Sequence, residues 1–218
     1  RRIARHLAPG GRLVIAIENR LGLKYWAGCT EDHVGKYFEG LENYPDTRSV
    51  RTFSRKELSD IIDQAGEFKT TFYYPYPDYK FPTVIYSDRR LPVVGELTDN
   101  IRNFDRDRLI TFNEKYVYDG LIEDGSFPDF SNSFMVITGE MPQATYVNDR
   151  AESYQLCTAL LETAEGREIR KYPLTEQAKG HVREMEHSCR LLKERYAGSD
   201  LRINECTLPA DGSYAGFD

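Results

Sequence analysis

Leu7-Ala-Pro-Gly-Gly-Arg-Leu-Val-Ile-Ala-Ile-Glu-Asn19 is the stretch of sequence from which the fold is predicted. Pro9-Gly-Gly11 ends a preceding helical turn, because neither residue type continues a helix well. Leu13–Ile17 is apolar without alternation, which is typical of a parallel strand buried on both faces. The polarity changes abruptly at Glu18, and ligands of open α/β sheets bind at the carboxyl ends of the strands. The stretch therefore predicts an α/β sheet with a ligand site beside Glu18 and Asn19.

Further elements follow in an order that agrees with such a sheet. Ser54 and Glu57 form a capping-box pattern that starts a helix, and Gly66 ends it. A long insertion rich in Pro, Tyr and Asp occupies residues 75–129, and we expect a helix in it that starts after Asn113 and stops at Gly125. Two β-branched and aromatic runs predict further strands, at Phe68–Tyr74 and Phe134–Thr138.

The overall composition limits the classes of function. The chain has 218 residues with 29 basic and 35 acidic side chains, a net charge of -6, so binding to nucleic-acid phosphates is not expected. No apolar run approaches the ~20 residues of a membrane span. The four cysteines show no metal or disulfide spacing, which predicts free thiols and a cytoplasmic location. Because the chain opens at Arg1 without a Met, we expect it to be part of a longer polypeptide.

The order helix, Leu7-Ala-Pro-Gly-Gly11, buried strand, capped helix, strand, insertion, strand resembles the C-terminal half of a class I S-adenosylmethionine-dependent methyltransferase. The resemblance implies that Leu13–Ile17, Phe68–Tyr74 and Phe134–Thr138 are the fifth, sixth and antiparallel seventh strands of a Rossmann-like half-sheet. We expect the first two to be parallel neighbours joined by a right-handed crossover. Ile17-Glu-Asn-Arg-Leu-Gly22 and the aromatic lobe after it look like methyltransferase modules linked to bacterial cell-surface glycan assembly.

The same resemblance implies S-adenosylmethionine as the cofactor. Members of the family hold it with a Gly-rich loop after the first strand, and no G-x-G occurs in this chain. We therefore expect no tight cofactor binding and no activity from residues 1–218 alone.

The C-terminal part of the chain predicts a second domain. We place the boundary after residue 142, so that residues 1–142 are methyltransferase-like and 143–218 form a small α+β segment. Tyr154–Leu161 and Arg167–Tyr172 read as a hairpin, followed by a helix at 175–196 with one apolar stripe. This order is similar to the N-lobe of kinase-like folds, and the resemblance implies a nucleotide-binding pair of Lys171 and Glu186.

Candidate site residues cluster near the predicted strand ends. Glu18 and Asn19 are expected to contact substrate; the alternative is a strand-end cap. His33 is a candidate general base for a hydroxyl acceptor, with Asp32 as a substrate contact. The alternative is that residues 30–32 are the acidic first turn of a short helix, and we predict no metal site.

The segment after the second strand supplies further candidates. Tyr74, Tyr76 and Asp78 are expected at the same ligand edge, where the rings would stack on a sugar. The alternative is that the rings pack as an aromatic plug over the sheet.

Two hypotheses of different classes follow. In the first, the chain is the acceptor-side part of a methyltransferase that O-methylates a glycan or a related cell-surface precursor. In the second, it is a non-catalytic interaction or scaffold module in a multidomain glycosyltransferase- or kinase-like protein. The partners expected are a small-molecule or glycan acceptor and the remainder of the parent polypeptide.

Overall fold

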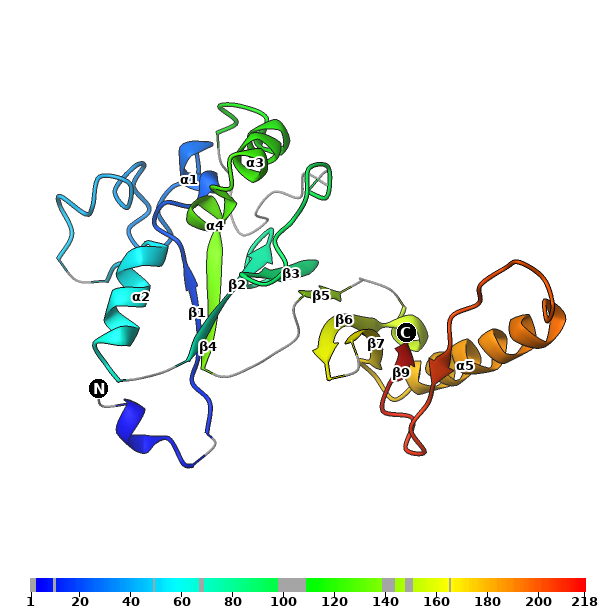
Figure 1. Cartoon of the computed structure of the whole chain (residues 1–218). Helices are drawn as coiled ribbons and strands as arrows, with labels where there is room; N and C mark the ends of the chain where they lie inside the picture. Colours follow the sequence, from blue (N-terminus) through cyan, green and yellow to red (C-terminus); the bar gives the residue numbers. More distant parts are fainter. Residues whose placement is uncertain are drawn as a thin grey trace. The chain divides into compact units, whose positions relative to one another are not determined.

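The computed structural model describes residues 3–9, 11–48, 50–66, 69–97, 109–138, 144–147, 151–164 and 166–218. The chain divides into two compact units, which we call unit 1 (residues 1–140) and unit 2 (residues 141–218). Figure 1 shows the elements of both. The boundary predicted after residue 142 lies outside the described residues.

Unit 1 combines short helices with an antiparallel sheet. The predicted strands are present with slightly shifted bounds, and the N-terminal turn is a 3-10 helix. The elements are η1 (Ile3–His6), β1 (Val14–Glu18), α1 (Leu23–Trp26), α2 (Arg55–Asp63), β2 (Thr70–Tyr76), β3 (Val84–Ser87), α3 (Glu114–Glu123), α4 (Phe127–Phe130) and β4 (Ser133–Thr138).

The strand order in unit 1 is β1-β4-β2-β3, and each pair is antiparallel. The expectation that β1 and β2 are parallel neighbours is therefore wrong. The expectation that the first strand is buried on both faces is also wrong, because β1 is at the end of this order and Val14 is 57% exposed. β4 lies between β1 and β2 (Figure 1), with Ile17 opposite Phe134 on one side and Thr71 opposite Ile137 on the other. Phe134, Val136 and Ile137 are almost wholly buried, as a central strand requires. Fold class is thus α+β with antiparallel pairing, rather than a parallel α/β sheet.

The two outer partners of β4 nevertheless run in the same direction. Both are antiparallel to β4, and the register places Glu18 opposite Ser133 and Thr70 opposite Thr138. The carboxyl ends of β1 and β2 therefore lie at the same edge of the sheet. The chain after β2 is tied to this edge, because Tyr79 donates its backbone N–H to Ser133 Oγ at 2.9 Å and Asn132 Nδ2 donates to the Pro77 carbonyl at 3.0 Å.

The predicted start of α2 is confirmed in detail. Ser54 accepts from the Glu57 N–H, and the Glu57 carboxylate accepts from the Ser54 N–H at 2.8 Å. Leu58 and Ile62 are buried, whereas Ile61 is 45% exposed. Ile61 therefore lies outside the buried face of α2, which is formed by Leu58 and Ile62.

The insertion contains the helix that was expected and one strand that was not. Asn113 caps α3 by accepting from the Lys115 N–H, and Gly125 follows the helix with a φ of 72°. β3 pairs with β2, with Tyr86 opposite Tyr74. This four-residue strand was not predicted, because the Pro and Asp residues beside it are typical of turns.

Unit 2 is an antiparallel sheet with one long helix. The strand order is β5-β6-β7-β9-β8, and the predicted hairpin is β6–β7. Ala178 and Val182 of the helix are fully buried with Leu156 and Ala215. The elements are β5 (Ala144–Val147), η2 (Glu152–Tyr154), β6 (Leu156–Thr163), β7 (Gly166–Pro173), α5 (Ala178–Arg195), β8 (Cys206–Thr207) and β9 (Ala215–Phe217).

Two expectations drawn from the composition can be compared with the described residues. None of the helices in the described ranges is both long and apolar enough to cross a membrane. Cys29, Cys157, Cys189 and Cys206 are free thiols, as predicted.

Candidate functional site

A buried lysine joins acidic side chains from three parts of unit 1. Lys24 Nζ lies 2.7 Å from Glu18 Oε2, 3.1 Å from Asp32 Oδ2 and 3.2 Å from Asp78 Oδ2. The Lys24 side chain is 0% exposed and the three carboxylates at most 5%. We call Glu18, Lys24, Asp32, Asp78 and the neighbouring Lys80 the acidic cluster.

The acidic cluster forms at the sheet edge because of where its members lie in the chain. Glu18 is the last residue of β1, and Lys24 lies on α1, which follows directly. Asp78 follows β2, which ends at the same edge. Asp32 comes from the lobe between α1 and α2. The cluster therefore links both strand ends to that lobe.

A second lysine covers the cluster on its solvent side. Lys80 Nζ lies 3.1 Å from Glu18 Oε1 and 3.3 Å from Asp32 Oδ1, and its side chain is 30% exposed. Each of these two carboxylates thus lies between a buried and a partly exposed ammonium group. Tyr25 also donates its hydroxyl to Asp32 Oδ2.

The surroundings of Glu18 and Asp32 shift the pKa values of the two carboxyl groups in opposite directions. Burial raises the pKa of Glu18 to about 7; Lys24 opposes this rise, and the charges of Asp78 and Asp32 add to it. Burial also acts on Asp32, but Lys24 and the Tyr25 hydroxyl outweigh it and lower the pKa of that carboxyl. Near neutral pH, the Glu18 carboxyl is therefore able to gain or lose a proton.

Lys24 remains charged in this setting. Burial alone would lower its pKa, but the three surrounding carboxylates raise it above the ordinary value of a lysine. The same burial and negative charges raise the pKa of the Tyr25 hydroxyl, which stays protonated. The cluster thus holds a fixed cation at its centre.

The backbone at the start of this site is held by two asparagines. Asn19 Nδ2 donates to the Asp129 and Ser131 carbonyls at 2.7 and 2.8 Å, and its Oδ1 accepts from the Leu21 N–H. Asn132 Oδ1 accepts from the Lys24 N–H at 2.9 Å. The Asn19 amide thus binds three backbone groups, as a strand-end cap does, and its substrate contact stays a prediction.

Gly22 allows the close approach between these segments. A Cβ at this position would lie 2.9 Å from the Asn132 Cα, a distance that side chains do not adopt. The turn from β1 into α1 can therefore pack directly on the residue that precedes β4, and this packing carries Lys24 to the sheet edge.

The predicted tyrosines make contacts with residues outside the acidic cluster. Tyr74 donates its hydroxyl to Asp88 and accepts from Arg55 Nε at 2.9 Å, and neither partner belongs to the cluster. The Tyr76 ring packs edge-on against Tyr118 at 5.7 Å. Both tyrosines are almost wholly buried, so these contacts agree with the aromatic plug.

His33 lies on the surface beside the cluster. It directly follows Asp32 in the chain and is exposed. Its backbone N–H and that of Val34 donate to Glu31 Oε2, at 2.8 and 2.7 Å. Glu31 is thus a cap for the turn at 32–34, which is not a helix. The catalytic role of His33 stays a prediction.

Sequence reasoning found three members of the cluster, Glu18, Asp32 and Asp78, but missed both lysines. A signal for Lys24 exists: it is the one charged residue in Leu23-Lys-Tyr-Trp26, where an amphipathic pattern is lacking. A charged residue enclosed by apolar neighbours is rarely buried unless it is paired. The residues next to Lys80 in the sequence give no sign that it belongs to the cluster.

The kinase-like pair of unit 2 lies on neighbouring elements. Lys171 is on β7, where its Nζ donates to Thr158 Oγ1 on β6 at 3.1 Å. Glu186 is on α5, and Arg190 lies one turn further along at 3.7 Å. A direct ion pair between Lys171 and Glu186 stays a prediction.

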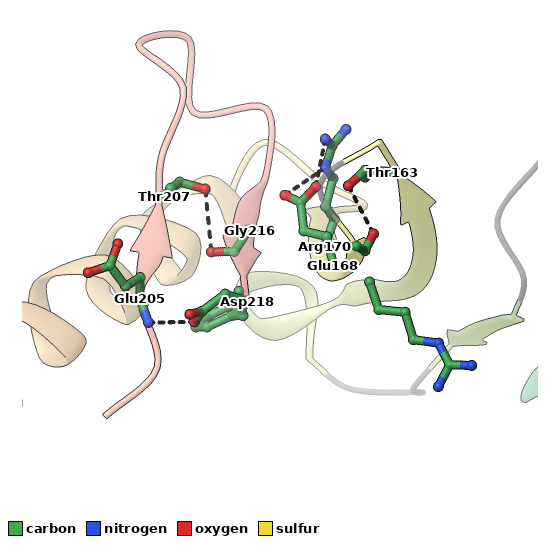
Figure 2. Close-up of a pocket in the computed structure, with 10 residues that line it drawn as sticks. Thr163, Glu168, Arg170, Glu205, Thr207, Gly216 and Asp218 are labelled. Atoms are coloured by element: carbon green, nitrogen blue, oxygen red, sulfur yellow. Dashed lines mark hydrogen bonds and ion pairs between the residues drawn. The ribbon is translucent and has the colours of Figure 1, made fainter. Parts of the chain in front are cut away.

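Unit 2 also has a surface hollow of about 410 Å³, shown in Figure 2. Arg170 there binds both Glu168 oxygens, at 3.0 and 2.8 Å, and lies over the Tyr214 ring. Glu205 donates its backbone N–H to Asp218 Oδ1. Of the charged side chains drawn in Figure 2, Arg170 and Glu168 pair with each other, whereas the Glu205 carboxylate pairs with Lys193, which is not drawn.

The described ranges contain no group of three or more His, Cys, Asp or Glu side chains arranged to hold a metal ion. The three carboxylates of the acidic cluster instead surround an ammonium group. No protein family, curated protein or solved structure shows significant similarity to the chain.

Proposed function

We propose that unit 1 is the acceptor-side part of an S-adenosylmethionine-dependent methyltransferase that O-methylates a glycan or a related cell-surface precursor. One observation carries the proposal: the acidic cluster gathers at the shared carboxyl edge of β1 and β2. The methyltransferase resemblance places the acceptor at that edge. β4 is the strand that the resemblance implies as the antiparallel seventh strand, and it is antiparallel to both β1 and β2.

The chain's own residues would act on the acceptor. S-adenosylmethionine supplies the methyl group in this reaction class, but the chain has no G-x-G loop, and we assign none of its residues to hold the cofactor. An acceptor hydroxyl must lose its proton as its oxygen is methylated, and the exposed His33 imidazole can accept that proton. The acidic cluster would fix the lobe that carries His33, through Asp32, against both strand ends.

The partly exposed Lys80 offers a contact for the acceptor. Its ammonium group has three donors and reaches solvent while bound to Glu18 and Asp32. A sugar hydroxyl beside it would meet both a cation and carboxylate oxygens, the mixed donor and acceptor set that carbohydrates need. A cytoplasmic location and a soluble glycan precursor as acceptor are part of the same proposal.

Methyl transfer from labelled S-adenosylmethionine to glycan precursors tests the proposal. The full-length polypeptide should transfer label, and Asp32→Asn should reduce transfer at least tenfold while far-ultraviolet circular dichroism stays unchanged. Lys36→Met is the matched control, because Lys36 pairs with Asp46 in the same lobe on the surface. Transfer that is unaffected by Asp32→Asn in a folded protein would contradict the assignment of this edge.

A second candidate function is supported by the internal pairing of the same cluster. Lys24 is enclosed by carboxylates and needs no ligand, as in a structural ion network. In that case unit 1 is a scaffold module joined to a kinase-like unit 2. Calorimetry distinguishes the two: a full-length polypeptide that binds no S-adenosylmethionine and transfers no label supports the scaffold.

A further inference from the structure

Two of the four cysteines meet between the helix and the last strands of unit 2. Cys189 lies on α5 and Cys206 begins β8, and the two thiols are close enough to interact electrostatically. Both line one surface hollow of about 290 Å³. They are half-buried, so small reagents can reach them. Residues 17 apart in the sequence are thus brought into side-chain contact.

Contacts that do not involve the thiols also hold the end of α5 next to the start of β8. Lys193 lies one helical turn after Cys189, and its Nζ is 2.5 Å from Oε1 of Glu205, the residue before Cys206. Cys206 also packs against the buried core of unit 2, which includes Val182 of α5. The face of α5 that carries Cys189 and Lys193 therefore contacts the start of β8 at Glu205 as well as near Cys206.

We propose that Cys189 and Cys206 are a redox-active pair that forms a disulfide between α5 and β8 when the protein meets a small-molecule disulfide such as oxidised glutathione. The bond would close an 18-residue loop and fasten the fourth turn of α5 to the sheet. Glu186, the helix member of the kinase-like pair, lies one turn before the fastened point. Oxidation would therefore fix the segment that carries Glu186.

The exchange balances in two steps. The Cys189 thiolate attacks one sulfur of the small disulfide, forms a mixed disulfide and releases one small thiolate. Cys206 then loses its proton to solvent and attacks the Cys189 sulfur, which releases the second small thiolate. The protein loses two electrons and two protons, and the small disulfide is reduced to two thiols.

The order of the steps follows from the surroundings of the two thiols. Burial, together with the electrostatic interaction with Cys189, raises the pKa of Cys206 to about 11, so this thiol stays protonated near neutral pH. Cys189 is therefore the thiol expected to react first.

Peptide mapping after treatment of the 218-residue chain with oxidised glutathione tests the proposal. The expected product has lost two thiols of four, carries no glutathione, and yields one linked peptide pair containing Cys189 and Cys206. Reduction with dithiothreitol should reverse it. Because a cross-link restricts the unfolded chain, the thermal midpoint of unit 2 should rise by about 5–15 °C on oxidation.

Single variants separate this pair from general thiol reactivity. Cys206→Ser should stop at a stable glutathione adduct on Cys189, whereas Cys157→Ser should form the internal bond normally. Cys157 is also partly buried but lies on β6. A linked pair that involves Cys29 or Cys157, adducts without an internal bond in the wild type, or four unreacted thiols would each overturn the proposal.

Discussion

Lys24 Nζ lies 2.7 Å from Glu18 Oε2 in a place that solvent does not reach. Burying a charged pair is costly, and its attraction offsets that cost only when the geometry is close and further polar partners are present. Here Asp32 and Asp78 supply those partners. The stability of unit 1 therefore depends on the charges of these four side chains.

Replacing Lys24 with Met should destabilise unit 1 by about 3–5 kcal/mol, because three buried carboxylates lose their central cation. Urea unfolding followed by fluorescence of Trp26, the only tryptophan, measures this directly. Lys56→Met is the control, since Lys56 forms an exposed pair with Asp60 on α2 and should leave the midpoint unchanged. A loss below about 1 kcal/mol for Lys24→Met would show that the carboxylates reach water.

The stability of unit 1 should fall as pH rises from about 5 to about 7. The Glu18 carboxyl titrates near 4.5 in the unfolded chain and at about 7 in the folded protein, so the folded state holds the extra proton within this window. The contribution is complete below pH 4.5 and lost above pH 7, and it amounts to about 3 kcal/mol. Unfolding free energies from urea titrations at several pH values measure it.

Glu18→Gln should remove this pH dependence, because the amide cannot titrate. Asp32 does not imitate the effect: its pKa is lowered, so its contribution is lost only as pH falls below about 4. The same decline between pH 5 and 7 in wild type and Glu18→Gln would rule out Glu18 as the titrating group.

Ser54→Ala should cost about 1 kcal/mol, because it removes the hydroxyl that accepts from the Glu57 N–H at the start of α2. Ser59→Ala, on the same helix, should change the midpoint little. Thermal unfolding by circular dichroism compares the two. Equal effects would mean that the capping box contributes nothing beyond local helix preference.

His33→Ala in the full-length polypeptide should lower methyl transfer by about 10²-fold if His33 accepts the hydroxyl proton. A change below about threefold in a folded variant would return His33 to a surface role and make Glu18 the next candidate base.

Amide hydrogen exchange should differ along α5. Ala178 and Val182 are fully buried, whereas Leu191 and Leu192 near the end of the helix are 48% and 43% exposed. We therefore expect slow exchange in the first two turns and fast exchange in the last two. Uniform protection along 178–195 would indicate that the exposed leucines are covered in solution.

Some features of this protein could be predicted from neighbouring residues alone. The capping box at Ser54 and the cap at Asn113 each depend on groups two or three residues away. The β6–β7 hairpin likewise follows from two strand-like runs joined by a short turn. Such elements form where the sequence predicts them because their hydrogen bonds are local.

The order of the strands was decided by the tertiary structure. β1 and β4 are separated by more than a hundred residues, yet they pair, and β4 enters between β1 and β2. Both β1 and β4 are apolar runs in the sequence, yet only β4 is central and almost wholly buried, so an apolar run by itself does not select its neighbours in the sheet. The expected parallel pairing failed for this reason.

The acidic cluster was likewise predicted only in part. The polarity change at Glu18 marked a strand end, and Asp78 follows the second strand, so the sequence by itself determined which edge would carry polar groups. It did not determine that Lys24 would be buried, because a buried ammonium group is stable only where carboxylates such as Asp32 and Asp78 lie beside it. Asp78 is 54 residues away along the chain, and only the folded sheet places its carboxylate 3.2 Å from the Lys24 ammonium group.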